Sequence, residues 1–244
     1  MAHRGYSAAY PENTLLAVES ALALGACFIE VDVHLSADHV PVVIHDADLR
    51  RTAGKEVNAM DYSFSQLQNF SVHEPERFGH KYLPQRIPSL QAVVESIRRH
   101  PKCTLFIEAK RASIAWVGVE AFLNAVEPVI ATAKDQCVLI SFDSQVLAAA
   151  KCRQLSPVGW VFEKWSEDSY RTFDRLHPDY LFTDYTKVPE GLANLPQGPW
   201  RWALYTIDEA TLALTWFEKG ADLVETNNFG ALIGHPAFTG RCNE

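Results

Sequence analysis

The sequence lacks the features that mark several large classes of protein. Basic residues are in the minority, because 22 Lys and Arg face 30 Asp and Glu and the formal net charge is −8. Sequence-independent binding to nucleic acid or to an anionic membrane needs a basic face, so both are excluded as main activities. The five cysteines form an odd set with no C-x-x-C pair, which indicates a reducing compartment. They are Cys27, Cys103, Cys137, Cys152 and Cys242.

Long apolar runs and targeting signals are also missing. The longest apolar stretch, residues 15–33, is interrupted by Glu19, Glu30 and Asp32, which predicts no transmembrane helix. The first residues show no basic segment followed by an apolar core, so we expect no targeting peptide, a cytoplasmic location and no stable membrane association. The motifs G-x-S-x-G, H-E-x-x-H and Walker A are absent, as are internal repeats and an H-x-H pair on the first predicted strand.

Strand and helix patterns alternate along almost the whole chain. With 244 residues and 48% hydrophobic content, the composition predicts one globular domain over residues 1–244. Eight strand–helix units of this size predict an α/β fold of the (β/α)₈ TIM-barrel type. The predicted strands are 2–4, 27–34 (with an extension at 40–45), 103–110, 137–142, 158–163, 180–184, 202–207 and 222–226. The predicted helices are 14–24, 89–100, 113–134, 144–154, 166–175, a short element at 189–194, and 209–219.

One irregular segment interrupts this alternation. Residues 46–88 mix polar, aromatic, Pro and Gly residues after the second predicted strand, which predicts a small insertion. Because it leaves the strand at its carboxyl end, we expect it to cover the mouth of the barrel and to contact the part of a substrate that lies there. Its aromatic residues can instead form a small local core, an interpretation that we favour for most of them. They are Tyr62, Phe64, Phe70, Phe78 and Tyr82.

Three carboxylates are predicted to gather at the carboxyl ends of two strands. Side chains alternate along a strand, so Glu30 and Asp32 share one face about 7 Å apart. By the same rule Glu108 and Lys110 point together on the next strand. An E-x-D pair often lies on the wet face of an edge strand, but in a buried setting the two carboxylates need a cation between them. Oxygen ligands suit Mg²⁺ or Ca²⁺, with Mn²⁺ as a further candidate, and the lack of clustered Cys or His disfavours zinc.

Short motifs in order along the chain carry a resemblance to a known family. They are Ala2-His3-Arg4-Gly5, Pro11-Glu12-Asn13-Thr14, Glu30-x-Asp32, His45-Asp46, Asp48-Leu49-x-Arg51-Thr52, Ile87-Pro88-Ser89-Leu90, Ile107-Glu108-Ala109-Lys110, Ser141-Phe142 and Tyr205-Thr206-Ile207-Asp208. In this order and spacing, the chain resembles the glycerophosphodiester phosphodiesterase family, and its short bacterial members most. The resemblance covers nearly the whole chain. It implies metal-dependent hydrolysis of a glycerophosphodiester to glycerol 3-phosphate and an alcohol.

The resemblance also implies roles for single residues. Glu30, Asp32 and Glu108 match the family's metal ligands, and the histidines that match His3 and His45 perform general acid–base catalysis. The reference pKa of histidine, near 6.5, suits one proton removal and one donation at neutral pH, although either residue taken alone is as readily structural. The sequence does not say which is the acid. We also expect Arg4 and Lys110 to bind the phosphoryl oxygens of the substrate. Phe142 and Tyr205 are expected to pack against its glycerol moiety. Arg4 and Lys110 can instead simply pair with neighbouring carboxylates.

Three positions depart from the family pattern. The last predicted strand ends in Thr226-Asn227 where Thr-Asp is usual, Glu225 stands where a small or apolar residue is usual, and Asp184 stands where Asn is common. We expect these departures to affect the rim or substrate preference without touching the proposed metal or proton-transfer residues. Two alternatives remain open: a related lysophospholipase D or sphingomyelinase D-type phosphodiesterase, and a non-catalytic phosphate-binding barrel. The leaving alcohol, the native metal and the oligomeric state are not determined by the sequence.

Overall fold

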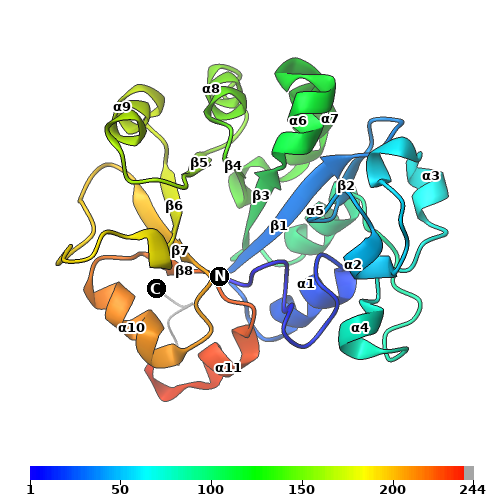
Figure 1. The fold of residues 1–244 in the computed structure, drawn as a ribbon, viewed down its shortest axis with the longest axis horizontal. Coiled ribbons are helices and arrows are strands. Elements are labelled where there is room, and N and C mark those ends of the chain that lie inside the picture. Colours follow the sequence, from blue (N-terminus) through cyan, green and yellow to red (C-terminus); the bar gives the residue numbers. More distant parts are fainter. Residues whose placement is uncertain (239–244) are drawn as a thin grey trace.

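The computed structural model describes residues 1–238, and its centre is a curled sheet of eight strands (Figure 1). The strand order is β2-β1-β3-β4-β5-β6-β7-β8. Strand β1 (Phe28–Leu35) pairs in parallel with β3 (Thr104–Ala109), and every later neighbour pair is also parallel. Strand β2 (Pro41–Val43) alone is antiparallel, because a short turn after β1 folds it back onto that strand.

Ala2 connects the two ends of this sheet. It forms parallel bridges to Ile29 in β1 and to Thr226 just after β8 (Leu223–Val224). The Ala2 N–H donates to the Phe28 carbonyl at 2.9 Å, and the His3 N–H donates to the Thr226 carbonyl at 2.9 Å. The expected first strand is therefore reduced to one bridging residue, but it lies between the second and the last predicted strands. This arrangement is consistent with the expected TIM-barrel fold.

Helices lie around the sheet and follow the strands in the expected alternation (Figure 1). The remaining strands are β4 (Cys137–Ser141), β5 (Val158–Val161), β6 (Tyr180–Asp184) and β7 (Arg201–Tyr205). The helices outside the irregular segment are α1 (Leu15–Ala23), α5 (Leu90–Arg98), α6 (Arg111–Val117), α7 (Val119–Ile130), α8 (Ser144–Cys152), α9 (Glu167–Leu176), α10 (Ala210–Glu218) and α11 (Phe229–Gly234). Short 3₁₀ turns are η2 (Ala131–Gln136), η3 (Tyr185–Lys187) and η4 (Pro236–Phe238). Thr14 and Ser89 cap α1 and α5 with their side chains.

The two faces of the strands form separate apolar clusters, which fixes the direction of the site residues. Ile29, Val31 and Val33 pack in the large cluster between sheet and helices. Phe106 belongs instead to the cluster inside the curled sheet, with Ile140, Phe182 and others. Because side chains alternate, Glu30 and Asp32 on β1 lie opposite the helix-facing residues, and Glu108 on β3 shares the face of Phe106. The alternation predicted from the sequence is confirmed.

Two predicted elements are wrong in detail. The single helix expected over residues 113–134 is two helices, α6 and α7, because Gly118 adopts a positive φ of 83° that breaks the helix. The short element expected at 189–194 has no regular structure, and the turn η3 precedes it.

The segment 46–88 contains short helical turns and its own small core. These are α2 (Arg50–Ala53), η1 (Ala59–Asp61), α3 (Phe64–Leu67) and α4 (Pro75–Phe78). Tyr62, Phe64 and Phe70 pack against a cluster that includes Leu49, Leu67 and Ile87, which confirms the local-core interpretation for these three. Tyr82 lies elsewhere, with its ring against Tyr10 and Phe78.

Within residues 1–238, no single helix has the length and apolar character needed to cross a membrane. One pair of helices, Arg111–Val117 with Val119–Gln136, reaches that length and composition together, and the pair is bent by 116°.

Candidate active site

A tight turn at the N-terminus places His3 and Arg4 beside the carboxylates of β1. Arg4 and Gly5 both have positive φ, 55° and 76°. A Cβ atom on Gly5 would lie 2.5 Å from the backbone carbon of Ala17, so only glycine fits against α1. The Arg4 N–H donates to a carboxylate oxygen of Glu30 at 3.0 Å. Within the Ala-His-Arg-Gly motif, Gly5 thus allows the turn and Arg4 contacts the site.

Glu30, Asp32 and Glu108 converge as the sequence predicts. One carboxylate oxygen from each lies within 4.8 Å of the others. The register that pairs Asp32 with Glu108 across β1 and β3 brings them together. Glu30 and Asp32 are only 2% and 1% exposed, so their charges need partners inside the protein.

Both carboxylate oxygens of Asp32 have such partners. Lys110 Nζ lies 3.1 Å from Oδ1, Arg4 Nε lies 3.1 Å from Oδ2, and the Asn13 amide donates to Oδ2 at 2.8 Å. Burial alone would raise the pKa of Asp32, but the charges of Lys110 and Arg4 lower it below its ordinary value. Asp32 is therefore ionised, and it organises the two cationic side chains of the site.

Glu30 and Glu108 are less well compensated. Burial and the charge of Asp32 raise the pKa of both carboxyls above their ordinary values. Oε1 of Glu30 is buried without any hydrogen-bond partner, whereas Glu108 accepts from Lys110 at 2.9 Å. A buried, unpartnered carboxylate oxygen beside two more carboxylates fits a divalent cation with oxygen ligands. These residues could hold the metal that the resemblance implies.

His3 is held by Asn227, which lies beyond the end of β8. Its Nδ1 lies 2.8 Å from Oδ1 of Asn227, and its Nε2 lies 4.0 Å from Glu30. The Asn227 amide faces Asp208, which accepts from Nδ2 at 3.4 Å and from the backbone N–H at 2.8 Å, so Oδ1 is the atom left for His3. Nδ1 therefore carries the hydrogen and Nε2 carries the lone pair. Burial and the charge of Arg4 lower the pKa of His3 to about 4.

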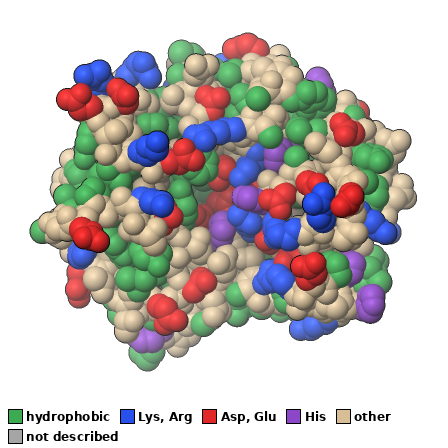
Figure 2. All heavy atoms as spheres, in the orientation of Figure 1, with side chains coloured by type: hydrophobic (Ala, Val, Ile, Leu, Met, Phe, Trp, Pro, Cys, Tyr) green, Lys and Arg blue, Asp and Glu red, His purple; other side chains and the backbone are tan. Residues whose placement is uncertain are grey.

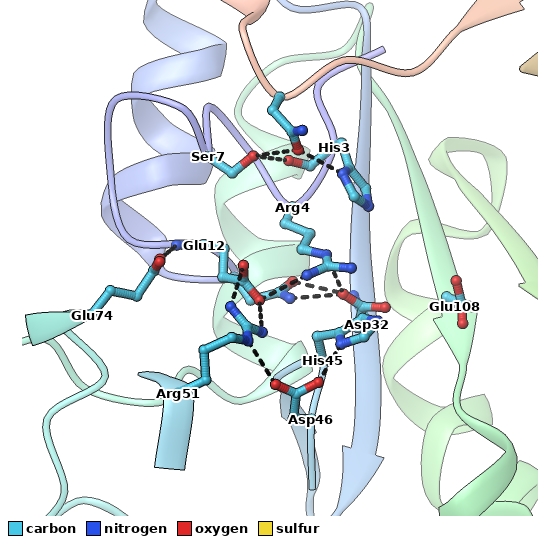
Figure 3. A network of polar contacts seen from close by, with 12 residues as sticks. His3, Arg4, Ser7, Glu12, Asp32, His45, Asp46, Arg51, Glu74 and Glu108 are labelled. Atoms are coloured by element: carbon cyan, nitrogen blue, oxygen red, sulfur yellow. Dashed lines mark hydrogen bonds and ion pairs between the residues drawn. The ribbon is translucent and has the colours of Figure 1, made fainter. Parts of the chain in front are cut away.

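His45 is oriented from the other side of the site by a chain of charged groups (Figure 3). Its Nδ1 lies 2.6 Å from Oδ1 of Asp46, and Arg51 Nε donates to the second Asp46 oxygen at 2.8 Å. Arg51 also donates to both oxygens of Glu12, which accepts from Arg4 at 2.9 Å. Burial would raise the pKa of Asp46, but the hydrogen bonds from His45 and Arg51 lower it. In Figure 3, Arg4 and Asp32 lie between the two histidines.

These residues surround a cavity of about 250 Å³. Figure 2 shows the hollow near the centre of this face, with acidic side chains inside it and basic and His side chains at its edge. The lining includes most of the predicted site together with apolar side chains. It consists of His3, Arg4, His45, Glu108, Lys110, Ile140, Phe142, Val161, Phe182, Tyr205, Thr206 and Glu225. Phe142 and Tyr205 are thus at the cavity, as the sequence predicts.

The segment 46–88 contributes no residue to this lining. Apart from Asp46 and Arg51, which hold His45 and Glu12, it contacts the N-terminal loop beside the site. Oε1 of the buried Glu74 accepts from the Glu12 N–H at 2.6 Å, and Arg77 and Tyr82 donate to the carbonyls of Ser7 and Ala9. The segment therefore holds the loop that carries Glu12.

The expectation that the family departures leave the site untouched is wrong for two of them. Asn227 bonds His3 directly, and Glu225 lines the cavity within 4.8 Å of His3 and Glu30 ligand atoms. Burial and the charge of Glu108 raise the pKa of Glu225 to about 8. Glu12, Asp46 and Arg51 also belong to the site, a role that residue spacing did not predict, although all three stand in the motifs that carry the resemblance. Spacing alone could not show that they touch one another.

Comparison with known proteins identifies the family. Residues 3–199 match the model of the "Glycerophosphoryl diester phosphodiesterase family". A glycerophosphodiester phosphodiesterase of Caldanaerobacter subterraneus is 27% identical over 242 residues, which cover 96% of this chain and 95% of that protein. One from Bacillus altitudinis is 35% identical over 119 residues, or 49% of this chain and 48% of that protein. Mouse glycerophosphodiester phosphodiesterase 1 is 34% identical over 110 residues, which cover 45% of this chain and only 33% of the mouse protein.

Solved structures share the fold. A phosphodiesterase of Oleispira antarctica, determined in complex with the product sn-glycerol-3-phosphate, superimposes with a TM-score of 0.83. Its sequence is 23% identical, and the match covers 96% of this chain and 94% of that one. A glycerophosphodiester phosphodiesterase of Thermotoga maritima gives a TM-score of 0.71 at 24% identity, covering 96% of each chain.

Proposed function

Because the chain belongs to the glycerophosphoryl diester phosphodiesterase family, we propose that it hydrolyses glycerophosphodiesters to glycerol 3-phosphate and an alcohol. The observation that carries this proposal is the convergence of Glu30, Asp32 and Glu108 beside a cavity that both His3 and His45 line. The sn-glycerol-3-phosphate bound to the Oleispira antarctica enzyme supports the assignment of glycerol phosphate as one half of the substrate. A small-molecule phosphodiester is the partner that this cavity fits.

Glu30, Asp32 and Glu108 would hold one divalent cation, Mg²⁺ or Ca²⁺, with Mn²⁺ as a further candidate. Bound there, the cation supplies Lewis-acid polarisation of the phosphoryl group. The protein's own contribution is the buried, preformed set of carboxylates. Their like charges are already partly offset by Lys110 and Arg4.

Arg4 and Lys110 bind the phosphoryl oxygens in this proposal. Both line the cavity, and both already pair with Asp32. The ion pairing expected as their alternative role is thus present, and it also fixes the two basic side chains at the cavity wall. Burial alone would lower the Lys110 pKa, but the charges of Asp32 and Glu108 raise it, so the amine stays charged while it offsets phosphoryl charge.

His3 is the general base and His45 the general acid. The Asn227 contact leaves His3 with a free lone pair at Nε2, and its low pKa keeps the ring neutral near pH 7. His45 instead has the Asp46 carboxylate at Nδ1, which stabilises the ring while it carries a proton. His3 Nε2 would take the proton of the attacking hydroxyl, and His45 Nε2 would protonate the leaving alkoxide.

Further properties follow as proposals. We propose one (β/α)₈ barrel domain over residues 1–244 with residues 46–88 as its insertion, supported by the Ala2 bridges and the parallel sheet. Residues 239–244 of this domain lie outside the described part of the chain. A reducing, cytoplasmic location is supported by the odd number of cysteines. The non-catalytic alternative is disfavoured, because both histidines and all three carboxylates are present.

The test is release of glycerol 3-phosphate from choline, ethanolamine and glycerol diesters, each assayed with Mg²⁺, Ca²⁺, Mn²⁺ or EDTA. We expect activity with at least one cation, none in EDTA, and loss of activity in Glu108→Gln. Glu218→Gln, an exposed glutamate on α10, serves as the matched control. Full activity in excess EDTA would contradict metal dependence, and absence of glycerol 3-phosphate under every condition would contradict the proposed reaction.

A further inference from the structure

Glu225 is a fourth acidic group in the cavity, and the metal-binding carboxylates proposed above do not explain it. It follows β8 directly, where its backbone N–H donates to the Leu204 carbonyl at 2.8 Å and its carbonyl accepts from Ile207 at 2.8 Å. The side chain is 5% exposed and lines the cavity. Its Oε1 is buried without a hydrogen-bond partner. Such an oxygen is costly to bury unless something binds it.

Two further atoms face the same place. One carboxylate oxygen of Glu225, one of Glu30 and a ring nitrogen of His3 lie within 4.8 Å of one another. Glu30 Oε1 also has no hydrogen-bond partner. Because Asn227 holds the hydrogen at His3 Nδ1, the atom that His3 offers is the Nε2 lone pair. Glu30 Oε2 lies 4.0 Å from His3 Nε2 and accepts from the Arg4 N–H at 3.0 Å. Three electron-pair donors thus converge, and both Glu30 and Glu225 keep one buried oxygen without a hydrogen-bond donor.

We propose that His3, Glu30 and Glu225 form a second cation subsite, which takes a borderline metal ion such as Zn²⁺ and inhibits the enzyme when it is filled. One imidazole nitrogen and two carboxylates suit Zn²⁺, whereas Glu30, Asp32 and Glu108 offer oxygen alone and suit Mg²⁺ or Ca²⁺. Glu30 belongs to both groups, so the two subsites adjoin.

The inhibitory consequence rests on the proposed function of His3. A cation on Nε2 occupies the lone pair that His3 needs to accept the proton of the nucleophile. The cation at the three-carboxylate site repels a second cation across the shared Glu30. The second cation therefore binds more weakly than it would if the three-carboxylate site were empty. Activation by Mg²⁺ and inhibition by Zn²⁺ then arise from different ligand sets within one cavity.

The experiment is calorimetric titration of Zn²⁺ into the full-length protein kept in saturating Mg²⁺. We compare the wild type with Glu225→Gln, Glu108→Gln and the surface control Glu218→Gln. We expect one Zn²⁺ to bind to the wild type, to Glu218→Gln and to Glu108→Gln. Glu225→Gln should bind this Zn²⁺ at least ~10-fold more weakly, because losing a metal ligand weakens affinity at least as much as losing an outer-shell contact. The ¹⁵N signal of His3 Nε2 in the wild type should shift on addition of Zn²⁺, a readout that needs no variant.

Equal Zn²⁺ affinity in Glu225→Gln and Glu218→Gln, or an unmoved His3 Nε2 signal, would overturn the subsite. Loss of Zn²⁺ binding in Glu108→Gln with retention in Glu225→Gln would also overturn it, because Zn²⁺ would then occupy only the three-carboxylate site. That result leaves metal-dependent hydrolysis intact. Conversely, absence of glycerol 3-phosphate release under every metal condition would remove the proposed reaction without affecting the binding result.

Discussion

Asp46 holds His45 through a 2.6 Å contact between Oδ1 and Nδ1, and Arg51 fixes the second oxygen of the same carboxylate. A carboxylate in this position keeps the hydrogen on Nδ1 and leaves Nε2 to exchange a proton with substrate. The adjacent residues His45-Asp46 therefore act as one unit, with Asp46 as a positioning residue.

Asp46→Asn should lower kcat by about 10–100-fold with a smaller effect on KM. The asparagine can turn its NH₂ group toward Nδ1 and favour the wrong tautomer of His45. Steady-state kinetics over pH 5–9 measure this change. Asp48→Asn is the matched control, because the exposed Asp48 contacts Arg50 alone, through the Arg50 N–H at 2.7 Å and the guanidinium at 3.8 Å, among the side-chain contacts of the described residues. Equal kinetics of the two variants would show that Asp46 has no part in catalysis.

His3→Ala and His45→Ala should each lower kcat by roughly 100-fold or more, the usual size for loss of a general acid or base. An acidic leaving group such as p-nitrophenol needs no protonation, so it should restore much of the rate in His45→Ala and little in His3→Ala. The ratio of rates on p-nitrophenyl and alkyl diesters measures this. Rescue of His3→Ala alone would reverse the assignment of acid and base, and wild-type rates in either variant would make that histidine structural.

The three carboxylates should differ in their effect on stability without metal. Glu30→Gln removes a buried charge with an unpartnered oxygen, so the unfolding temperature of the apo protein should rise by about 2–4 °C, as expected for ~1 kcal/mol in a chain of this size. Asp32→Asn should lower it, because Arg4 and Lys110 lose their partner. Thermal unfolding in EDTA compares them.

Both substitutions, and Glu108→Gln, should abolish the rise in unfolding temperature that Mg²⁺ or Ca²⁺ gives the wild type. If Glu30→Gln lowers the unfolding temperature of the apo protein as much as Asp32→Asn does, the proposed difference between these carboxylates is contradicted.

Replacing residues 56–82 by a short Gly/Ser linker should reduce kcat as well as raise KM. The sequence alone predicts a change in head-group discrimination, but the structure adds that this segment includes Glu74, whose carboxylate holds the Glu12 N–H. Glu74→Gln tests that contact by itself and should give a milder loss of kcat. A truncated enzyme with unchanged kcat and unchanged ranking of choline, ethanolamine and glycerol diesters would show that the segment serves neither purpose.

The sequence by itself determined the face of each strand and the residues that carry the proposed chemistry. Period-two alternation is a local property of the chain, so Glu30 with Asp32 and Glu108 with Lys110 could be paired from spacing alone. The break at Gly118 was missed, because the apolar pattern continues across it and a glycine inside a helix is often tolerated.

Tertiary structure decided which distant residues meet. Asn227 and Glu225 follow the last strand, more than two hundred positions from His3, and they reach it only because Ala2 bridges β1 and the end of β8. The link from Arg4 through Glu12 and Arg51 to Asp46 likewise joins separate motifs. Residue types and spacing specify what each strand can present, whereas the closure of the sheet sets the distances between charges, and with them the pKa values and the cation sites.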